Sequence, residues 1–293
     1  MKLVSRFILF LVFLSVIQFS LDSIFLNTLL RSNFRFSEIY NDSKSKKYDA
    51  VCFGNSRGVN SFFTPSINNE NSKFYNFSYN GLNIEHISAL LMDFVDSINT
   101  SKHVFIEIST IFNSNKENSF SKLNLYSSLS DRISNGIKNS DYNLYLINKY
   151  LPLYKYNNEL YYRVLYYLNK SDQNWVNEYR ISQSLIDKVN KMNDFDLQLN
   201  EKDLNELNRL LAFLNSKNIE TTLYIAPYLP SYRSKISNYE SNLKKIELYL
   251  NTEVLDLSLY ITEQSYFADR VHTNKKGAIL ITKKLLNDYI LIK

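Results

Sequence analysis

The amino-acid sequence predicts an α/β fold, a three-layer arrangement around a doubly wound sheet of about five parallel strands, with a helical insertion and an N-terminal membrane helix. Short apolar runs without polar alternation recur along the chain, as expected of strands covered on both faces. Segments with helical spacing of apolar residues accompany these runs, which is the pattern of a parallel α/β domain. An apolar stretch near the N-terminus predicts the membrane helix.

Each predicted strand is a run short enough to be a buried strand. The runs are residues 50–53, 74–77, 104–108, 222–226 and 254–257. Further stretches place apolar residues at helical spacing and are predicted to cover the sheet. These are residues 84–98, 204–214, 239–250 and 278–290.

The stretch from about residue 115 to residue 200 interrupts this rhythm. It is rich in Tyr, Asn, Ser and Leu, and it has helical spacing over 141–150 and 161–168. We expect a mostly helical insertion after the third strand. Insertions at strand ends lie on the active-site face of such sheets, so this one is either a lid or acceptor groove, or an appendage without substrate contact.

Residues 7–19 are almost entirely apolar and follow the basic residues Lys2 and Arg6. A positive flank before an apolar run directs a chain to the membrane with its N-terminus inside. A cleaved signal peptide, a retained anchor and a buried N-terminal helix are the alternatives. No Ala-x-Ala-like cleavage site follows, which favours retention, although Asp22 leaves the strictly apolar part short for a full span.

We therefore expect consecutive regions along the chain. Residues 1–30 form a signal-anchor, a transmembrane helix, and residues 31–47, which are mostly polar and charged, form a linker. Residues 48–293 form the folded domain that contains the insertion. This domain is expected outside the cytoplasm, anchored to the cytoplasmic membrane and facing the periplasm or the cell surface.

The composition narrows the classes of partner and cofactor. The net charge of +5 is spread along the chain without a basic arm or stripe, so nucleic acid is not expected as a partner. Cys52 is the single cysteine and lies in an apolar run, which predicts a buried thiol and excludes an internal disulfide. No grouping of His, Cys, Asp or Glu has metal-ligand spacing, so neither a metal nor another cofactor is predicted.

The segment Gly54-Asn55-Ser56 follows the first predicted strand, where the chain should turn into a helix. Gly54 permits the tight backbone of such a turn. Ser56 would then stand at a helix start, where free N–H groups favour a developing negative charge, and its own N–H can serve as an oxyanion donor. The segment has a second interpretation, because serine at this place is commonly the N-cap of a helix.

The segment from Asp269 to His272 lies near the other end of the chain, before a predicted helix. A separation of three residues across a turn lets Asp269 bind the Nδ1–H of His272, which leaves Nε2 free to take a proton from Ser56. Alternatively, Asp269 is a cap or pairs with Arg270 or Lys275. Together, the two segments predict a serine nucleophile, its base and an orienting acid.

Three other charged or titratable residues are expected to have structural rather than catalytic roles. Arg57 follows Ser56 and is expected in a structural ion pair rather than on an anionic substrate. Glu107 lies in an apolar run and is expected to be a carboxylate at the edge of the core with a partner. His86 lies on a helical stretch and is expected on the helix surface.

These segments resemble the SGNH (GDSL-type) hydrolase superfamily. The first block of that family, Gly-Asp-Ser after the first strand, resembles Gly54-Asn55-Ser56, with Asn55 in place of the aspartate. The last block, Asp-x-x-His, is matched by Asp269 and His272. The second block carries an oxyanion glycine after the second strand, and Gly81 inherits that role by similarity.

The third block of the family, Gly-x-Asn-Asp after the third strand, is not matched. Its Asn donates to the oxyanion, and Ile111 falls at that position here. Asn113, or the hydroxyl of Ser109 or Thr110, is the candidate replacement. The loss of one oxyanion donor costs about 2.7–4 kcal/mol of transition-state stabilisation.

The resemblance covers roughly residues 48–112 and 220–290 and implies a flavodoxin-like sheet. With a membrane anchor, the chain is similar to proteins that modify cell-envelope polysaccharides. That similarity implies an O-acyltransferase or esterase acting on an extracytoplasmic glycan or acyl ester, with the membrane and other envelope-modification proteins as partners. The alternative is a catalytically weak or inactive polysaccharide-binding or assembly protein with the same fold.

Overall fold

The computed structural model of the protein describes residues 2–43, 45–68, 72–112, 120–171 and 175–291. The chain forms two compact units, each of them discontinuous in sequence. The first, called the N-terminal unit here, comprises Met1–Lys44 and Glu117–Asp172. The second, called the sheet unit, comprises Ser45–Lys116 and Gln173–Lys293.

The sheet unit contains five parallel strands in the order β2-β1-β3-β4-β5. This is the flavodoxin-like order of a doubly wound sheet, so the predicted fold class is confirmed. All five predicted strands are present, with ends shifted by a few residues. They are β1 (Lys47–Phe53), β2 (Phe74–Asn76), β3 (Thr100–Glu107), β4 (Glu220–Ile225) and β5 (Val254–Asp256).

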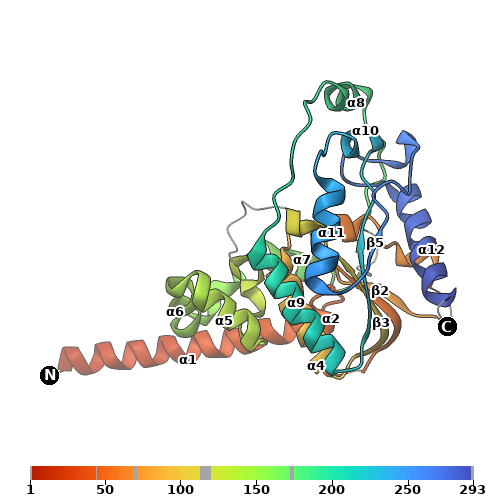
Figure 1. The fold of residues 1–293 in the computed structure, drawn as a ribbon. Coiled ribbons are helices and arrows are strands. Elements are labelled where there is room, and N and C mark those ends of the chain that lie inside the picture. The colour runs from red at the N-terminus through yellow and green to blue at the C-terminus, as the bar shows by residue number, and fades with distance from the viewer. Residues whose placement is uncertain (1, 44, 69–71, 113–119, 172–174, 292–293) are drawn as a thin grey trace. The chain divides into compact units, whose positions relative to one another are not determined.

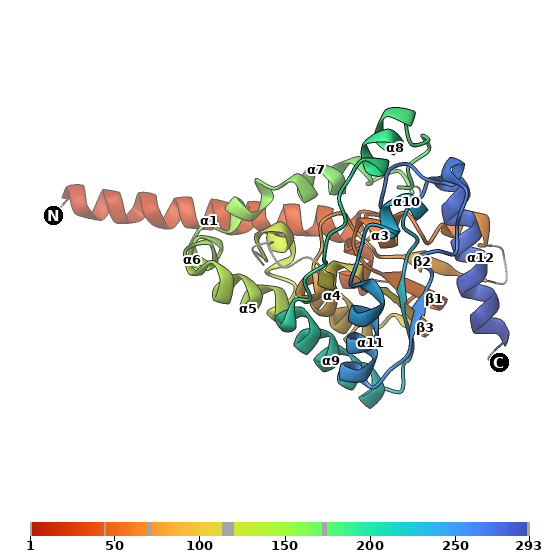
Figure 2. The same cartoon turned by 45° about the horizontal axis from the view of Figure 1, so that its top comes forward.

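Helices cover both faces of this sheet, as Figures 1 and 2 show. One face carries α4 (Ile84–Asp96), α9 (Glu201–Ser216) and α11 (Tyr239–Leu250), with α9 packed between the other two. The opposite face carries α12 (Lys275–Leu291). Shorter helices at the strand ends are α3 (Ser56–Val59), η1 (Thr64–Ser66), η2 (Ser109–Phe112), α8 (Gln183–Asn190), α10 (Pro230–Arg233) and η5 (Gln264–Tyr266).

The alternation of side chains along the strands explains why both faces are covered. Ala50 and Cys52 of β1 join a core cluster with Phe105, Tyr224 and Leu285, the last from α12. Val51 and Phe53 of β1 alternate with them, point to the other face and are equally buried. Burial of the Cys52 thiol confirms the expectation for the single cysteine.

Strands β1 and β3 lie side by side, but the chain leaves them in opposite directions. The connection from β1 leads to β2 at one edge, and the connection from β3 leads to β4 on the other side. Such a reversal of strand order is a topological switch point, where parallel α/β sheets bind ligands at the carboxyl ends of the strands. The segments after Phe53 and after Glu107 therefore meet at this place.

The N-terminal unit is built from helices around the second part of α1 (Lys2–Arg31). Its other helices are α2 (Ser37–Tyr40), η3 (Phe120–Tyr126), α5 (Asp131–Ser140), α6 (Tyr142–Tyr150), η4 (Pro152–Tyr156) and α7 (Glu159–Tyr166). α1 is apolar and long enough to cross a membrane over Leu3–Arg31. Side chains up to Ser20 are almost all exposed, whereas Leu29 is fully buried in the unit.

The structure differs from the expected linker at residues 31–47. Phe34, Phe36 and Ile39 are buried, and Ser32 donates its hydroxyl to the Val164 carbonyl at 2.8 Å. The segment is polar on average, but its few large apolar side chains find partners more than 80 residues away, such as Tyr126. Most of the expected linker is therefore part of the core of the N-terminal unit.

The expected insertion at 115–200 is mostly helical, as predicted, but it divides between the two units. Residues 120–171 belong with the N-terminal segment, and residues 175–200 belong with the sheet unit. Residues 113–119, and with them the candidate Asn113, lie outside the described residues. The sequence did not predict α5, because only Ile133 and Ile137 of that helix are buried.

Candidate active site

Ser56 lies at the switch point, directly after β1. Gly54 precedes it where a Cβ would come within 2.8 Å of the Cβ of Glu107, so the turn passes closely over β3. Asn55 is the N-cap of α3 and accepts the Arg57 N–H at 2.8 Å. Because Asn55 caps the helix, the alternative role of Ser56 as the cap does not apply.

His272 joins the two predicted segments. Its Nε2 lies 2.8 Å from Ser56 Oγ, and its Nδ1 lies 2.8 Å from Asp269 Oδ2. A carboxylate at Nδ1 favours the tautomer with the proton on that nitrogen, which leaves Nε2 as the acceptor of the serine proton. Residues 216 positions apart in the sequence therefore form one continuous hydrogen-bonded chain.

The carboxylate of Asp269 is held ionised by its surroundings. Partial burial by itself raises the pKa of this carboxyl, but the hydrogen bond from His272 and two backbone donors outweigh it and lower the pKa. Those donors are the N–H groups of Val271 and His272, both at 2.8 Å from Oδ1. Asp269 therefore stays charged beside the imidazole, as an orienting acid must.

The loop that carries His272 is fixed to the nucleophile segment. The hydroxyl of Thr273 donates to the carbonyl of Asn60, and the amide of Asn60 donates to the Ser56 carbonyl at 2.8 Å. Asn274 accepts N–H groups from the first turn of α12. The base is thus held from two sides, which limits its movement relative to Ser56.

Gly81, the predicted oxyanion glycine, lies in the turn after β2. It adopts a φ of 72°, the left-handed region that glycine adopts without a steric penalty. The same turn is bound to the nucleophile segment, because the Tyr79 N–H donates to the Gly54 carbonyl at 3.1 Å. The turn of Gly81 is therefore anchored two residues from Ser56.

The third predicted donor is not found among the described side chains of η2. Ile111 is fully buried and apolar. The Ser109 hydroxyl donates to Glu107 Oε2 at 2.9 Å, and the Thr110 hydroxyl points to the Leu82 carbonyl at 3.4 Å. Both hydroxyl protons therefore have acceptors within the protein.

Arg57 and Glu107 form a buried pair behind the nucleophile, with Arg57 Nε 3.6 Å from Oε1, as expected for a structural ion pair. The Arg57 guanidinium also donates to the carbonyls of Ala226 and Pro227 and lies 3.5 Å from the ring centre of Tyr228. Burial raises the pKa of Glu107, against the opposing effect of Arg57 and of hydrogen bonds from Ser109 and Ala226. The pair connects the nucleophile turn to the end of β4.

The expectation for His86 is wrong. The side chain is buried rather than on the helix surface, and it forms a capping box with Asn83 at the start of α4. His86 Nδ1 accepts the Asn83 N–H at 3.3 Å, while Asn83 Oδ1 accepts the His86 N–H at 3.0 Å. An imidazole can take the place of the usual Glu or Gln in this motif, and the pattern of apolar residues gave no sign of it.

Sequence reasoning missed the segment 175–181. Trp175, the single tryptophan, lies 5.3 Å from the ring centre of Tyr79 in an edge-to-face contact. Two residues on, the Asn177 N–H donates to Asn60 Oδ1 at 2.9 Å, and the Asn177 carbonyl accepts the Lys275 N–H at 2.8 Å. An aromatic side chain from the expected insertion is thus placed beside the turns of Ser56 and Gly81.

Among the described residues, no group of three or more His, Cys, Asp or Glu side chains could hold a metal ion.

No protein-family model and no curated protein matches the chain. Solved structures with a similar fold include the following two. A protein of Bacteroides fragilis described as a candidate acylhydrolase is 10% identical, with a TM-score of 0.41 over 85% of this chain and 88% of that one. A protein of Streptococcus pneumoniae described as a candidate platelet activating factor is 13% identical, with a TM-score of 0.44 over 97% of this chain and 98% of that one.

Proposed function

We propose that the sheet unit catalyses acyl transfer or ester hydrolysis, with Ser56 as nucleophile, His272 as base and Asp269 as the residue that orients His272. The observation that carries the proposal is the unbroken hydrogen-bonded chain from Ser56 Oγ through both imidazole nitrogens to Asp269, with 2.8 Å at each step. This is the geometry by which a serine hydroxyl is activated in hydrolases of unrelated folds.

In the first half of the reaction, Ser56 Oγ attacks the carbonyl carbon of an ester while His272 Nε2 takes the hydroxyl proton. The N–H groups of Ser56 and Gly81 are the proposed donors to the oxyanion. The tetrahedral intermediate collapses, the bond to the leaving alcohol breaks, and His272 returns the proton to that alcohol. A second alcohol or a water molecule then attacks the acyl-enzyme by the same steps in reverse.

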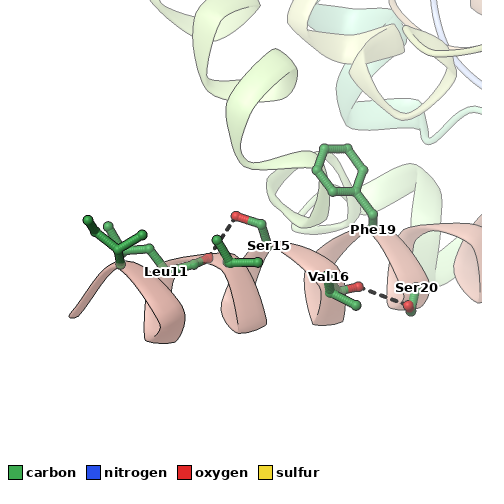
Figure 3. A pocket seen from close by; sticks show the side chains of 7 residues that line it. Leu11, Ser15, Val16, Phe19 and Ser20 are labelled. Atoms are coloured by element: carbon green, nitrogen blue, oxygen red, sulfur yellow. Dashed lines mark hydrogen bonds between the residues drawn. The ribbon is translucent and has the colours of Figure 1, made fainter. Parts of the chain in front are cut away.

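We place this chemistry on a glycan outside the cytoplasm, next to a membrane that holds the chain through α1. The exposed part of α1 supports the anchor. Figure 3 shows Ser15 and Ser20 on its apolar surface, where their hydroxyls donate to the carbonyls of Leu11 and Val16 at 2.9 and 2.8 Å. A hydroxyl satisfied within its own helix can enter hydrocarbon without an unpaired donor.

The second part of α1 supports retention of the anchor over its removal as a signal peptide. Asp22 Oδ1 forms an ion pair with the Lys155 ammonium at 2.7 Å and accepts a hydrogen bond from the Tyr156 hydroxyl at 2.8 Å. Phe25 contacts the rings of Tyr156 and Tyr161. These contacts make the second part of α1 a structural element of the N-terminal unit, which supports a retained anchor.

The aromatic pair of Trp175 and Tyr79 supports a ring-shaped acceptor. A half-buried indole against Tyr79, in the turn that carries Gly81, offers a flat apolar surface, and the apolar face of a pyranose packs on such surfaces. A sugar hydroxyl held there would be the second alcohol that takes the acyl group from Ser56. Transfer rather than hydrolysis then depends on the sugar displacing water from this place.

A fluorophosphonate probe on the full chain in detergent tests the proposal, because it forms a covalent bond only with an activated serine. We expect labelling of the wild type and loss of labelling in Ser56→Ala and His272→Ala. Ser241→Ala, an exposed serine on α11, is the matched control and should label like the wild type. A folded wild-type chain that does not label would contradict catalysis.

The alternative function is glycan binding or assembly without catalysis. One observation favours it: Ile111 stands where the third oxyanion donor is expected, and the hydroxyls of Ser109 and Thr110 are bonded elsewhere. The same probe separates the two functions. Absence of labelling together with oligosaccharide binding by the folded chain would favour the binding protein.

A further inference from the structure

The N-terminal unit contains a polar cavity of about 280 Å³ that the proposed reaction does not use. It opens among η3, α5, α6 and η4, and most of its lining carries hydrogen-bonding groups. These side chains include Ser127, Ser128, Ser134, Asn148, Lys149 and Lys155.

Lys155 brings a buried positive charge to this cavity. The residue is 2% exposed, and its ammonium pairs with Asp22 at 2.7 Å and donates to Ser128 Oγ at 3.0 Å. An ammonium has three N–H donors, so one donor has no polar acceptor among the described residues. Lys149 adds a second positive charge at the rim, against the single negative charge of Asp22.

Asn148 contributes a buried acceptor. Its amide nitrogen donates to Asn124, but its Oδ1 is buried and has no hydrogen-bond partner among the described residues. Buried polar atoms without a partner are rare in native proteins, and a bound water, ion or ligand is one explanation for such an atom. The cavity far exceeds the roughly 30 Å³ that one water molecule takes up, and it has room for a polar group of several atoms.

The position of Asp22 in α1 indicates where the cavity lies relative to a membrane. The stretch of α1 in which almost every side chain is exposed ends at Ser20, two residues before Asp22, and beyond it exposed side chains such as Ile24 alternate with partly buried ones. A helix rises 1.5 Å per residue, so residues 3–20 extend about 27 Å, close to the thickness of a hydrocarbon core. If that part spans the bilayer, Asp22 and its partner Lys155 lie at the level of the lipid headgroups.

We propose that this cavity binds the phosphate-bearing headgroup of a membrane lipid. The ammonium groups of Lys149 and Lys155 and the serine hydroxyls donate to the phosphate oxygens, and Asn148 Oδ1 accepts from a hydroxyl or ammonium of the headgroup. Two lysines against one aspartate favour an anion, and charge-assisted hydrogen bonds to phosphate are strong. The inference rests on the proposed anchor but not on the proposed chemistry of Ser56.

Native mass spectrometry of the full chain in detergent, with short-chain phosphatidylglycerol added, tests the inference. We expect one bound lipid per wild-type chain. Lys149→Gln, which removes an exposed charge, and Ser134→Leu, which fills the cavity, should lower the bound population at least tenfold. Lys170→Gln is the control, because it removes an exposed charge of the same unit outside the cavity lining, and it should bind like the wild type.

Inorganic phosphate in place of the lipid separates the two sources of a phosphate group. Phosphate binding that depends on Lys149, without binding of the lipid, would show a site for free phosphate and overturn the lipid proposal. Equal lipid binding by wild type, Lys149→Gln and Ser134→Leu would overturn it as well. Fluorophosphonate labelling of the same samples reports on Ser56 separately, so either proposal can fail without the other.

Discussion

Asn55 takes a structural role that would otherwise fall to Ser56. It takes the cap of α3, so the hydroxyl of Ser56 is available for His272. The sequence predicted Ser56, Asp269 and His272 together, because each stands in a short local pattern next to a predicted strand or helix. It could not predict the contact between Trp175 and Tyr79, nor that the partner of Glu107 would be Arg57, since these depend on tertiary contacts that leave no local pattern.

Asp269→Asn tests the orienting acid at this scale. An amide at this place can present N–H instead of a carboxylate to Nδ1, which favours the tautomer that cannot take the serine proton. We expect the rate of fluorophosphonate labelling to fall about 10³–10⁴-fold with little change in melting temperature. Asp194→Asn, an exposed acid of the same unit, is the control. A loss of less than tenfold would contradict the assigned role.

Removal of Arg57 should make stability depend on pH. Arg57→Ala leaves Glu107 buried without its cation, at a cost of about 3–5 kcal/mol in the free energy of unfolding. The folded-state pKa of Glu107 is already raised by burial, so the folded chain favours the protonated acid, and stability is lost as the pH rises through that pKa.

Denaturation of Arg57→Ala at pH 5 and pH 8 checks this, with a larger loss expected at pH 8. The double variant Arg57→Met with Glu107→Leu should recover most of the stability, because it leaves no unpaired charge. An equal loss at both pH values would show that Arg57 acts through packing alone.

Trp175 is a reporter of acceptor binding, since its emission is that of the only tryptophan in the chain. We expect that soluble oligosaccharides which protect Ser56 from the fluorophosphonate also change the emission of Trp175. Tyr79→Ala should weaken both effects, because it removes the ring that Trp175 contacts. An oligosaccharide that protects Ser56 and leaves the emission unchanged would contradict an acceptor site at this ring.

Among the elements, the strands of the sheet were the most predictable because buried parallel strands are continuous apolar runs. The bounds of α11, residues 239–250, agree with its apolar spacing. α8 was missed for the opposite reason: it is short and buries only Ile186 and Val189. Strand order cannot come from such runs, because it depends on which connections cross the sheet.

In the first turn of α9, the buried carboxylate of Asp203 lowers the stability of the folded chain, and a substitution should remove this effect. Asp203 is 1% exposed, and burial, together with nearby Glu85 and Glu206, raises its pKa to about 6 despite Lys202. Because this exceeds the roughly 3.9 of an unfolded aspartate, ionisation lowers stability as the pH rises from about 4 to about 6.

Asp203→Asn should therefore raise the free energy of unfolding by roughly 1–3 kcal/mol at pH 8 and leave it nearly unchanged at pH 4. Chemical denaturation at the two pH values measures the difference. Glu201→Gln, an exposed acid in the same turn, should show no such pH-dependent gain. A stabilisation of Asp203→Asn that is equal at both pH values would have another cause.

The whole molecule combines two units whose sequences interleave, and this was the least predictable feature. Asp22 and Lys155 are 133 residues apart, and neither the polar segment 31–47 nor the Tyr-rich stretch 120–171 shows by itself that they share a core. Local patterns predict elements, whereas the assignment of elements to units depends on contacts over this distance. The apolar α1 was predicted as an anchor, and its second part proved to be a structural helix as well.

We predict that the whole of α1 is retained in the mature chain, because its second part packs into the N-terminal unit. Removal of the segment around Asp22 would leave the Lys155 ammonium buried without its carboxylate, at a cost of about 3–5 kcal/mol. We expect peptide mapping of the chain extracted from membranes to recover residues 3–31, and we expect the chain to persist in the membrane after a carbonate wash. A soluble chain shortened by its first 20 or more residues would contradict retention.

Asp22→Asn should speed proteolysis of the N-terminal unit while fluorophosphonate labelling of Ser56 continues, because the triad lies wholly in the sheet unit.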